Sequence, residues 1–568
     1  MRRLLLSLPI LLSLGCEPEP APPMPGDVTL TRAWQSETFA GCVLASPLEH
    51  DGHVIVSTGD GRVVALDPDD GTIVWELVLP EPEGTLAHVI ATPVIVGDRL
   101  VLTWQVVDAT ARDPAAGPRS AHHVAVVDLV RGELDPAFPI VTLAASRPSA
   151  DGSGEVVFRA SNALSRSRLV HATTADHELG LVYVSFGNAR DIQPWHGWIF
   201  ELDLDAWRAR GAESAIASVL LTSPSNECGI DGESGSDDMI CGAGVWSPAG
   251  PLLVPDDEHG FALIVPTGNG ALDLATRSYA HTLMRVRGPG LSFDPRCDAS
   301  ACAEFDVLDP APACIASCED LFVPRLSPED PPFDAPGCEE LTFFECYAAL
   351  DWDLGANTPA RVELASGRVV YVLPAKDGGV YLLDDEHLGT LHDRVQVVAA
   401  CGAGGVPCEA NWAGTMVTQP LIADVDGTPL AIIATFMPDA VHPAGLVALR
   451  VIEDEGGAHL EPAWTWPSFD GQEARERFRR HPSGLRLVTI EGEDHVAIVE
   501  QGRLGSEPGV LHLVRARDGA HAERVALDGP GQRYAVPLAL GTRLIVPSCD
   551  QGNAGPGHVE AWDAVVVR

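Results

Sequence analysis

The sequence predicts an all-β fold, a single β-propeller of eight four-stranded blades that is closed by pairing of its N- and C-terminal strands. Three observations support this prediction. Short apolar runs alternate with turns rich in Asp and Gly, a unit made of such runs recurs eight times, and segments with strand character stand near both ends. Radial stacking lets each sheet cover a face that one sheet cannot bury alone.

The composition is that of a strongly acidic globular protein. Of 568 residues, 46% are hydrophobic, and 37 basic against 80 acidic side chains give a net charge of −43. Lys376 is the only lysine, so arginine supplies the other basic side chains. We expect no nucleic-acid partner, because phosphate binding requires a basic surface.

The first 16 residues read as an export signal. Arg2 and Arg3 precede an apolar run, and Gly15 stands before Cys16. This pattern resembles a bacterial lipoprotein signal, which implies lipidation of Cys16, and ordinary secretion is the alternative. Residues 17–27 are rich in Pro and predict an extended tether to a propeller formed by residues 28–568. No later stretch is apolar and long enough for a transmembrane helix, so only a lipid anchor would hold the chain at a membrane.

Residues 45–77 are the clearest repeat unit. The apolar runs HVIVST, RVVALD and TIVWEL are joined by turns with Asp and Gly, which predicts an antiparallel meander. Seven of the eight units open with a proline. These prolines are Pro47, Pro93, Pro248, Pro359, Pro420, Pro482 and Pro537.

The two ends of the chain are predicted to share a blade. The last unit has three strand-like runs, and residues 28–36 supply a fourth, which would remove the open edge of the ring. Residues 289–350 depart from the repeat and are rich in Cys, Pro and acidic residues. We expect them to form a disulfide-stapled insertion on one face, and we regard it as a second candidate for a partner-binding surface.

Twelve cysteines remain after Cys16, an even number that suggests disulfides in an exported protein. A bond between Cys42 and Cys549 would fasten the closure of the ring. Local spacing suggests three further pairs, Cys228 with Cys241, Cys297 with Cys302, and Cys401 with Cys408. A cluster of four, Cys314, Cys318, Cys338 and Cys346, leaves three connectivities open.

The segment GRVVALDPDDGTIVWEL at residues 61–77 resembles the repeat of the quinoprotein-like propellers, named after relatives that bind pyrroloquinoline quinone. KDGGVYLLDDEHLG at residues 376–389 and GHVEAWDA at residues 557–564 are similar copies. The resemblance implies that Trp75, Trp198 and Trp562 pack between neighbouring blades. It is specific for fold and carries little information about function.

Quinoprotein dehydrogenases of this fold hold pyrroloquinoline quinone and calcium in the central funnel. Those enzymes usually have adjacent cysteines, which this chain lacks, and we find no convincing match to their acidic-base and calcium-ligand segments. We therefore assign no catalytic residue and no cofactor, with quinone or calcium as the alternatives. Asp424 and Asp426 suit calcium by spacing, but the glutamate that an EF-hand loop needs at its twelfth position is replaced by Thr435, so a hairpin turn is the preferred interpretation.

The mouth of the funnel is the better candidate for a binding site. Residues at the starts of the innermost strands surround that mouth in a propeller, where ligands tend to bind. The candidates are the residues beside the opening prolines, with His171 in the unit that lacks one. They are Ser46, Thr92, His171, Ser247, Thr358, Gln419 and His481.

We expect a non-catalytic binding or scaffold lipoprotein of the cell envelope, in the outer membrane or on the cell surface, acting as a monomer on an envelope protein or glycan. A periplasmic or secreted protein is the alternative location. The alternative function is a quinone- or metal-dependent oxidoreductase with its site in the funnel. A calcium-stabilised adhesin is a third hypothesis.

Overall fold

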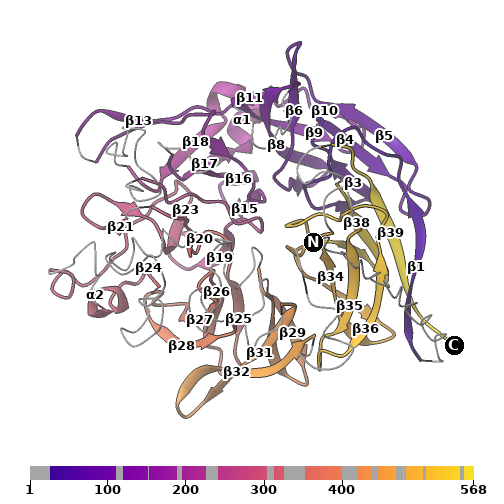
Figure 1. Cartoon of the computed structure of the whole chain (residues 1–568). Coiled ribbons are helices and arrows are strands. Elements are labelled where there is room, and N and C mark those ends of the chain that lie inside the picture. The colour runs from indigo at the N-terminus through magenta and orange to yellow at the C-terminus, as the bar shows by residue number, and fades with distance from the viewer. Residues whose placement is uncertain are drawn as a thin grey trace, which may run out of the picture.

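The computed structural model describes most of the chain as a ring of antiparallel sheets around a common axis (Figure 1). It describes residues 26–110, 119–150, 152–188, 195–224, 241–270, 272–303, 312–324, 352–398, 419–435, 444–467, 478, 481–502, 507–549 and 555–568. The predicted propeller of eight blades is confirmed. The export signal with Cys16 lies outside the described residues, and in the part described no helix is long and apolar enough to cross a membrane.

The first four blades follow one another along the chain. Blade 1 contains β2 (Leu48–His50), β3 (His53–Ser57), β4 (Arg62–Leu66) and β5 (Ile73–Val78). Blade 2 contains β6 (Thr85–His88), β7 (Val94–Val96), β8 (Arg99–Asp108), β9 (Arg119–Asp128), β10 (Glu133–Leu134) and β11 (Val141–Thr142). Blade 3 contains β14 (Ala163–Leu164), β15 (Val170–Thr174), β16 (His177–Asn188), β17 (Trp198–Asp203) and β18 (Ile216–Leu221). Blade 4 contains β19 (Leu252–Asp256), β20 (Gly260–Pro266), β23 (Leu283–Gly288) and β24 (Leu321–Phe322).

The other four blades each have four strands. Blade 5 contains β25 (Ala360–Glu363), β26 (Val369–Pro374), β27 (Gly379–Asp384) and β28 (Leu391–Gln396). Blade 6 contains β29 (Leu421–Val425), β30 (Thr428–Ala434), β31 (Leu446–Asp454) and β32 (Gly457–Trp466). Blade 7 contains β33 (Arg486–Ile490), β34 (Glu493–Glu500), β35 (Val510–Arg515) and β36 (His521–Ala526). Blade 8 contains β37 (Leu538–Leu540), β38 (Arg543–Pro547), β39 (Val559–Val566) and β1 (Val28–Gln35).

Smaller elements decorate the ring. Hairpins are formed by β12 (Ser146–Pro148) with β13 (Glu155–Val157) and by β21 (Leu272–Asp273) with β22 (Ser278–Tyr279). The helices are α1 (Leu204–Arg210), η1 (Ala212–Ser214) and α2 (Pro312–Ala316). Helix α1 begins after Asp203 because that carboxylate accepts the amide N–H of Ala206 at 2.8 Å.

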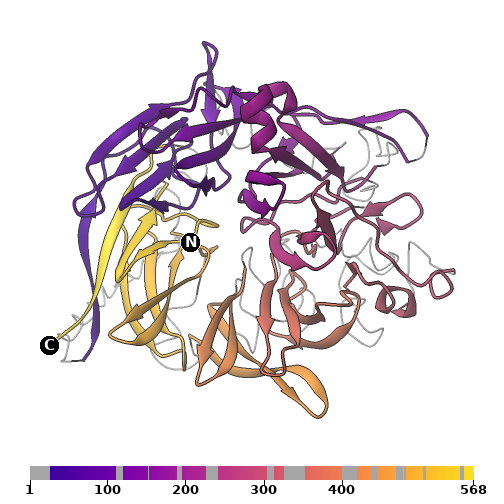
Figure 2. The ribbon, with the colours of Figure 1, turned by 180° about the vertical axis from the view of Figure 1, so that it is seen from behind.

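Closure of the ring follows the prediction. Strand β1 pairs antiparallel with β39, from Val28 opposite Val566 to Gln35 opposite Glu560, so the first and last described strands share blade 8. Figure 2 shows the indigo and yellow ends of the chain running side by side. The predicted disulfide between Cys42 and Cys549 is present and joins residues 507 positions apart.

A hydrophobic cluster fills each seam between neighbouring blades. The cluster between blades 8 and 1, for example, joins Ile545 and Val559 to Val54 and Val64, all at 0% exposure. Corresponding clusters join every other pair of neighbours around the ring. Burial of apolar side chains between sheets is therefore what holds the ring together.

Tryptophan rings lie on glycines at three of these seams. A Cβ added at Gly71, Gly132 or Gly519 would lie 2.4, 2.6 and 2.5 Å from the rings of Trp34, Trp75 and Trp464, respectively. These glycines have positive φ angles of 74°, 68° and 71°, so both the tight turn and the close ring exclude a side chain. Trp75 thus packs on the next blade, while Trp198 and Trp562 lie in clusters that join blades 2 and 3 and blades 7 and 8.

The first part of the predicted insertion at residues 289–350 stands between two strands of blade 4. The chain leaves β23, α2 follows, and β24 at residues 321–322 returns to the sheet as the fourth strand. The part of the insertion from residue 325 onward lies outside the described residues. The expected Cys297–Cys302 pair is wrong, because Cys297 bonds Cys318 and Cys302 bonds Cys314. Helix α2 and its following turn bring Cys314 and Cys318 close together, so each takes one cysteine of the preceding loop.

The expected cluster of four cysteines is wrong for the same reason, since Cys314 and Cys318 are used in those bonds. Cys338 and Cys346 lie outside the described residues, as do Cys401 and Cys408. Cys241 forms a disulfide, and its expected partner Cys228 also lies outside the described part of the chain.

Candidate functional site in the central channel

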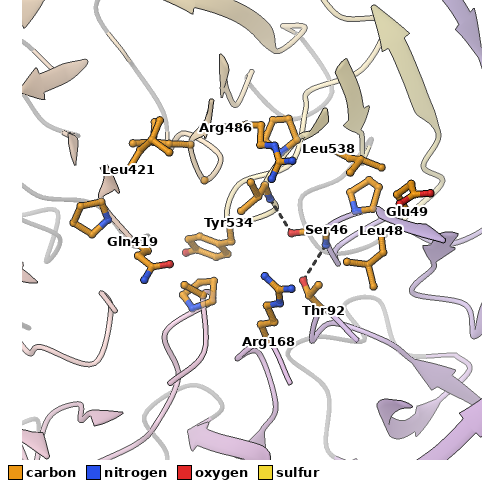
Figure 3. A pocket seen from close by; sticks show the side chains of 18 residues that line it. Ser46, Leu48, Glu49, Thr92, Arg168, Gln419, Leu421, Arg486, Tyr534 and Leu538 are labelled. Carbon is orange, nitrogen blue, oxygen red and sulfur yellow. Dashed lines mark hydrogen bonds between the residues drawn. The ribbon is translucent and has the colours of Figure 1, made fainter. Parts of the chain in front are cut away.

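A cavity of about 300 Å³ lies on the axis of the ring, where the innermost strands begin (Figure 3). We call it the mouth pocket. Seven of the eight blades contribute to its wall, which places it at the centre of the ring. The lining residues are Ser46, Pro47, Leu48, Glu49, Thr92, Arg168, Pro248, Ala249, Gln419, Pro420, Leu421, Gly484, Leu485, Arg486, Tyr534, Val536, Pro537 and Leu538.

Three of the predicted funnel residues, Ser46, Thr92 and Gln419, line this pocket. The hydroxyl of Thr92 accepts the amide N–H of Ser46 at 3.0 Å, and the hydroxyl of Ser46 accepts the amide N–H of Val536 at 2.8 Å. The side-chain amide of Gln419 donates to the carbonyl of Pro359 at 2.9 Å. These polar groups therefore join the strand starts of blades 1, 2, 5, 6 and 8 to one another.

The other predicted funnel residues are absent from the pocket wall. The hydroxyls of Ser247 and Thr358 are buried and lie 2.8 Å apart, so they join blades 4 and 5. His481 lies with its ring 6.1 Å from that of Tyr534. His171 is within β15 and its Nε2 lies 2.8 Å from the carbonyl oxygen of Leu179.

Arg168 takes the place in blade 3 that His171 was expected to fill. It stands two residues before β15, as Ser46, Thr92 and Gln419 stand two residues before β2, β7 and β29. The unit that forms blade 3 lacks the opening proline, so the start of its innermost strand could not be located from the sequence. That strand begins earlier than expected.

Two guanidinium groups, from Arg168 and Arg486, point toward one another in the mouth pocket (Figure 3). Both side chains are exposed to the channel. The crowded channel wall, which displaces water, lowers the pKa of Arg168, and repulsion from Arg486 lowers it further. Glu49 also lines the pocket, but its carboxylate accepts the amide N–H of Gly52 at 2.9 Å in its own hairpin.

Trp246 lies next to this pocket, because Arg166 contacts both its ring and the ring of the lining residue Tyr534. A Cβ added at Gly187, Gly268 or Gly355 would lie 2.6, 3.1 and 2.7 Å from Trp246 atoms, so glycines of three blades permit this position of the indole. Trp246 remains partly exposed, unlike the tryptophans that fill the core. The arrangement supplies a flat aromatic surface fixed from several sides.

Lys376 and Asp353 form a buried ion pair beside that surface. The Lys376 ammonium lies 3.1 Å from an Asp353 carboxylate oxygen, and each residue is 2% exposed. The same ammonium lies 4.8 Å from the centre of the Trp246 ring. Burying two charges costs several kcal/mol per ion in desolvation, so this pair does not follow from a need for stability.

Cations and aromatic rings alternate from the mouth pocket to this ion pair. Arg533 and Arg166 lie 4.8 and 5.0 Å from the centre of the Tyr534 ring. Arg166 also lies 5.8 Å from the centre of the Trp246 ring, whose other cation is Lys376. Three cationic side chains therefore lie against these two aromatic rings, although the whole chain carries a net charge of −43.

A buried histidine near Lys376 is affected by the charge of that lysine. His281 is fully buried, and burial together with the nearby charge of Lys376 lowers its pKa to about 3. The neutral imidazole is thus the form that this part of the channel wall accommodates.

The residues proposed as calcium ligands form a tight turn. The Asp424 carboxylate accepts the amide N–H of Gly427 at 2.9 Å, and Asp426 pairs with Arg517 at 2.7 Å. Asp426 and Gly427 have φ angles of 54° and 82°, which suits the two-residue hairpin between β29 and β30. Elsewhere in the described residues, the one group of three metal-ligand side chains is Cys297, Cys302 and Cys318, which are already in disulfides.

Trp246, Asp353 and Lys376 were not predicted as site residues from the sequence. One signal was available: a chain that uses arginine everywhere else keeps a single lysine. The convergence of that lysine with Asp353 and Trp246 depends on the arrangement of blades 4 and 5, which spacing along the chain does not reveal.

Comparison with known proteins supports the fold. A sequence model of the family described as outer membrane protein assembly factor BamB matches residues 31–175, about a quarter of the chain. The search of curated protein sequences finds no match.

Solved structures of similar fold cover nearly the whole chain. A europium-containing methanol dehydrogenase has 11% identity and a TM-score of 0.53, covering 94% of this chain and 93% of its own. A quinohemoprotein alcohol dehydrogenase, ADHIIG, from Pseudomonas putida HK5 has 12% identity and a TM-score of 0.51, covering 95% and 77%. The fold is that of a quinoprotein-like β-propeller.

Proposed function

We propose that this chain is an exported, lipid-anchored propeller of the cell envelope that acts as a non-catalytic binding protein and holds a planar anionic ligand in its central channel. One observation carries the proposal: the only lysine of the sequence is buried beside the partly exposed ring of Trp246. We call Trp246, Lys376 and Asp353 the Trp246 site.

The chemistry of the Trp246 site favours a flat ligand with negative charge. A planar ring system can stack on the indole, which glycines hold in a fixed position. Lys376 and Arg166 both lie against that indole and would attract carboxylates on the ligand. Pyrroloquinoline quinone has this shape and charge, so it is the natural probe.

The expected location supports the same proposal. The leader with Cys16 favours a lipid anchor in the outer membrane or on the cell surface, and the match to the BamB family at residues 31–175 is consistent with an envelope protein. We propose a monomer that contacts an envelope protein or glycan through its loop face, where the insertion of blade 4 stands.

Equilibrium dialysis of the purified protein against pyrroloquinoline quinone, with and without calcium, tests the Trp246 site. We expect saturable retention of one quinone per chain and at least roughly tenfold weaker binding in Lys376→Met/Asp353→Asn and in Trp246→Leu. Arg450→Gln, which changes an exposed residue of β31, should bind like the unmodified protein. Absence of retention, or retention that survives both channel variants, would contradict the proposal.

A quinone-dependent oxidoreductase is the second candidate. The observation that favours it is a buried carboxylate, that of Asp353, in the Trp246 site. The quinone would be held by Trp246, Lys376 and Arg166, and when bound it would supply a two-electron acceptor. Asp353 is the candidate to accept a proton from an alcohol substrate, because its carboxylate lies 3.1 Å from the Lys376 ammonium, which itself lies against the Trp246 ring.

Dye reduction with alcohols or sugars separates the two candidates once quinone is retained. Retention without dye reduction supports the binding protein. Turnover that disappears in Asp353→Asn while quinone retention persists would support the oxidoreductase and contradict the non-catalytic proposal.

A further inference from the structure

We propose that the mouth pocket is a second binding site, specific for a small organic anion with an apolar body, and that Arg168 and Arg486 hold its head group. The site is distinct from the Trp246 site and does not rest on the function proposed above. Its evidence is the pair of facing guanidiniums, the cavity between them and the character of its wall.

The arginines lack the acidic partners that such groups usually have. In the described part of the chain neither side chain is in an ion pair or a hydrogen bond, although the protein has 80 acidic residues. Among the described residues of the wall, the single carboxylate is that of Glu49, which accepts the amide N–H of Gly52 in its own hairpin turn. Two like charges are thus brought together in a concave site without compensation.

In the ligand-free protein this arrangement has an energetic cost, and a bound anion would remove that cost. The two guanidiniums repel one another, and the pocket wall removes part of the water around Arg168. An anion between the arginines removes the repulsion and accepts charge-assisted hydrogen bonds from both groups. A structural role would instead have placed a carboxylate beside them.

The rest of the wall selects an anion with an apolar part. Prolines and leucines from several blades surround the arginines, including Leu48, Leu421 and Leu538 (Figure 3). A cavity of about 300 Å³ holds a ligand of modest size, larger than inorganic phosphate. A short-chain carboxylate places its head on the arginines and its chain on this apolar ring.

Sodium octanoate is a suitable probe, with inorganic phosphate and octylamine as comparison ligands at constant ionic strength. We expect a saturable rise in the melting temperature with octanoate, a weaker response to phosphate and none to octylamine. By calorimetric titration, Arg168→Gln and Arg486→Gln should each weaken octanoate binding roughly tenfold or more, and the double variant should abolish it. Arg450→Gln is the control for loss of one exposed arginine.

The double variant also distinguishes binding from structural support. Without octanoate its melting temperature should equal or exceed that of the unmodified protein, because the repulsion is removed. It should also retain pyrroloquinoline quinone as the unmodified protein does, which separates this test from that of the Trp246 site. A lower melting temperature without ligand, octanoate binding by the double variant, or equal binding of phosphate or octylamine would overturn the proposal.

Discussion

Tryptophan rings lie on glycine both at the seams between blades and next to the mouth pocket, and the two regions use the same contact differently. At the seams, Trp34 and Trp464 donate their indole N–H groups to the carbonyls of Pro68 and Ala516 at 2.7 and 3.0 Å. Trp246 instead has two cations against its ring, and like Trp464 it is partly exposed. The indoles of Trp34 and Trp464 thus join neighbouring blades through a hydrogen bond to the backbone, whereas a ring flanked by charge offers a surface to a ligand.

Removing one tryptophan ring from each region tests this comparison, and it should give the largest effect on stability. Trp34 is 7% exposed and fills the seam that closes the ring. We expect Trp34→Ala to lower the free energy of unfolding by about 3–5 kcal/mol. Trp246→Ala should cost less than half as much, because that ring is less buried. Urea unfolding measures both, and equal losses would show that Trp246 is a core residue like Trp34.

The closing seam is also fastened covalently, which gives the next largest effect. Cys42→Ser/Cys549→Ser should lower the free energy of unfolding by about 2–5 kcal/mol, because the bond closes a very long loop. Cys302→Ser/Cys314→Ser is the matched control, since its bond spans 12 positions and should contribute less. A larger loss in the control would place the critical constraint in the insertion rather than at the closure.

The third effect is the smallest for a single step of the experiment, one pH unit, and it concerns His281 of the channel wall. His281 has a pKa of about 3 in the folded protein and an ordinary value of 6.5. Below pH 6.5 the unfolded chain takes up a proton that the folded protein does not. Stability therefore falls as the pH decreases from 6.5 toward 3, by up to about 1.4 kcal/mol per pH unit.

His281→Asn should remove this part of the acid sensitivity, as measured by urea midpoints between pH 7 and pH 4. His387→Asn, which changes an exposed histidine, should leave the pH dependence unchanged. An unchanged slope in His281→Asn would mean that the histidine titrates normally in the folded protein.

The ring could be predicted because its determinants are local and repeated. Each unit shows apolar alternation and turn residues on its own, and the terminal pairing follows once one unit lacks a strand. The Cys42–Cys549 bond was then a consequence of closure. The Cys297–Cys302 prediction failed because sequence spacing ignores the turn of α2 that presents Cys314 and Cys318.

The channel was harder to predict because its residues come from different blades. Ser46, Thr92 and Gln419 were found through their common position before a strand, and Arg168 was missed because its unit lacks the proline that marks this position. Trp246, Lys376 and Asp353 share no spacing at all. Their proximity depends on the order of blades around the axis, which no single unit contains.

The pairing of β1 with β39 has a consequence for how the protein reaches its final shape. A chain made from its N-terminus contains β1 well before its partner strand exists. Until then β1 is an unpaired edge, open to association with other chains. Blade 8 is therefore the last blade that can be completed, and β1 is the strand whose protection before that point matters most.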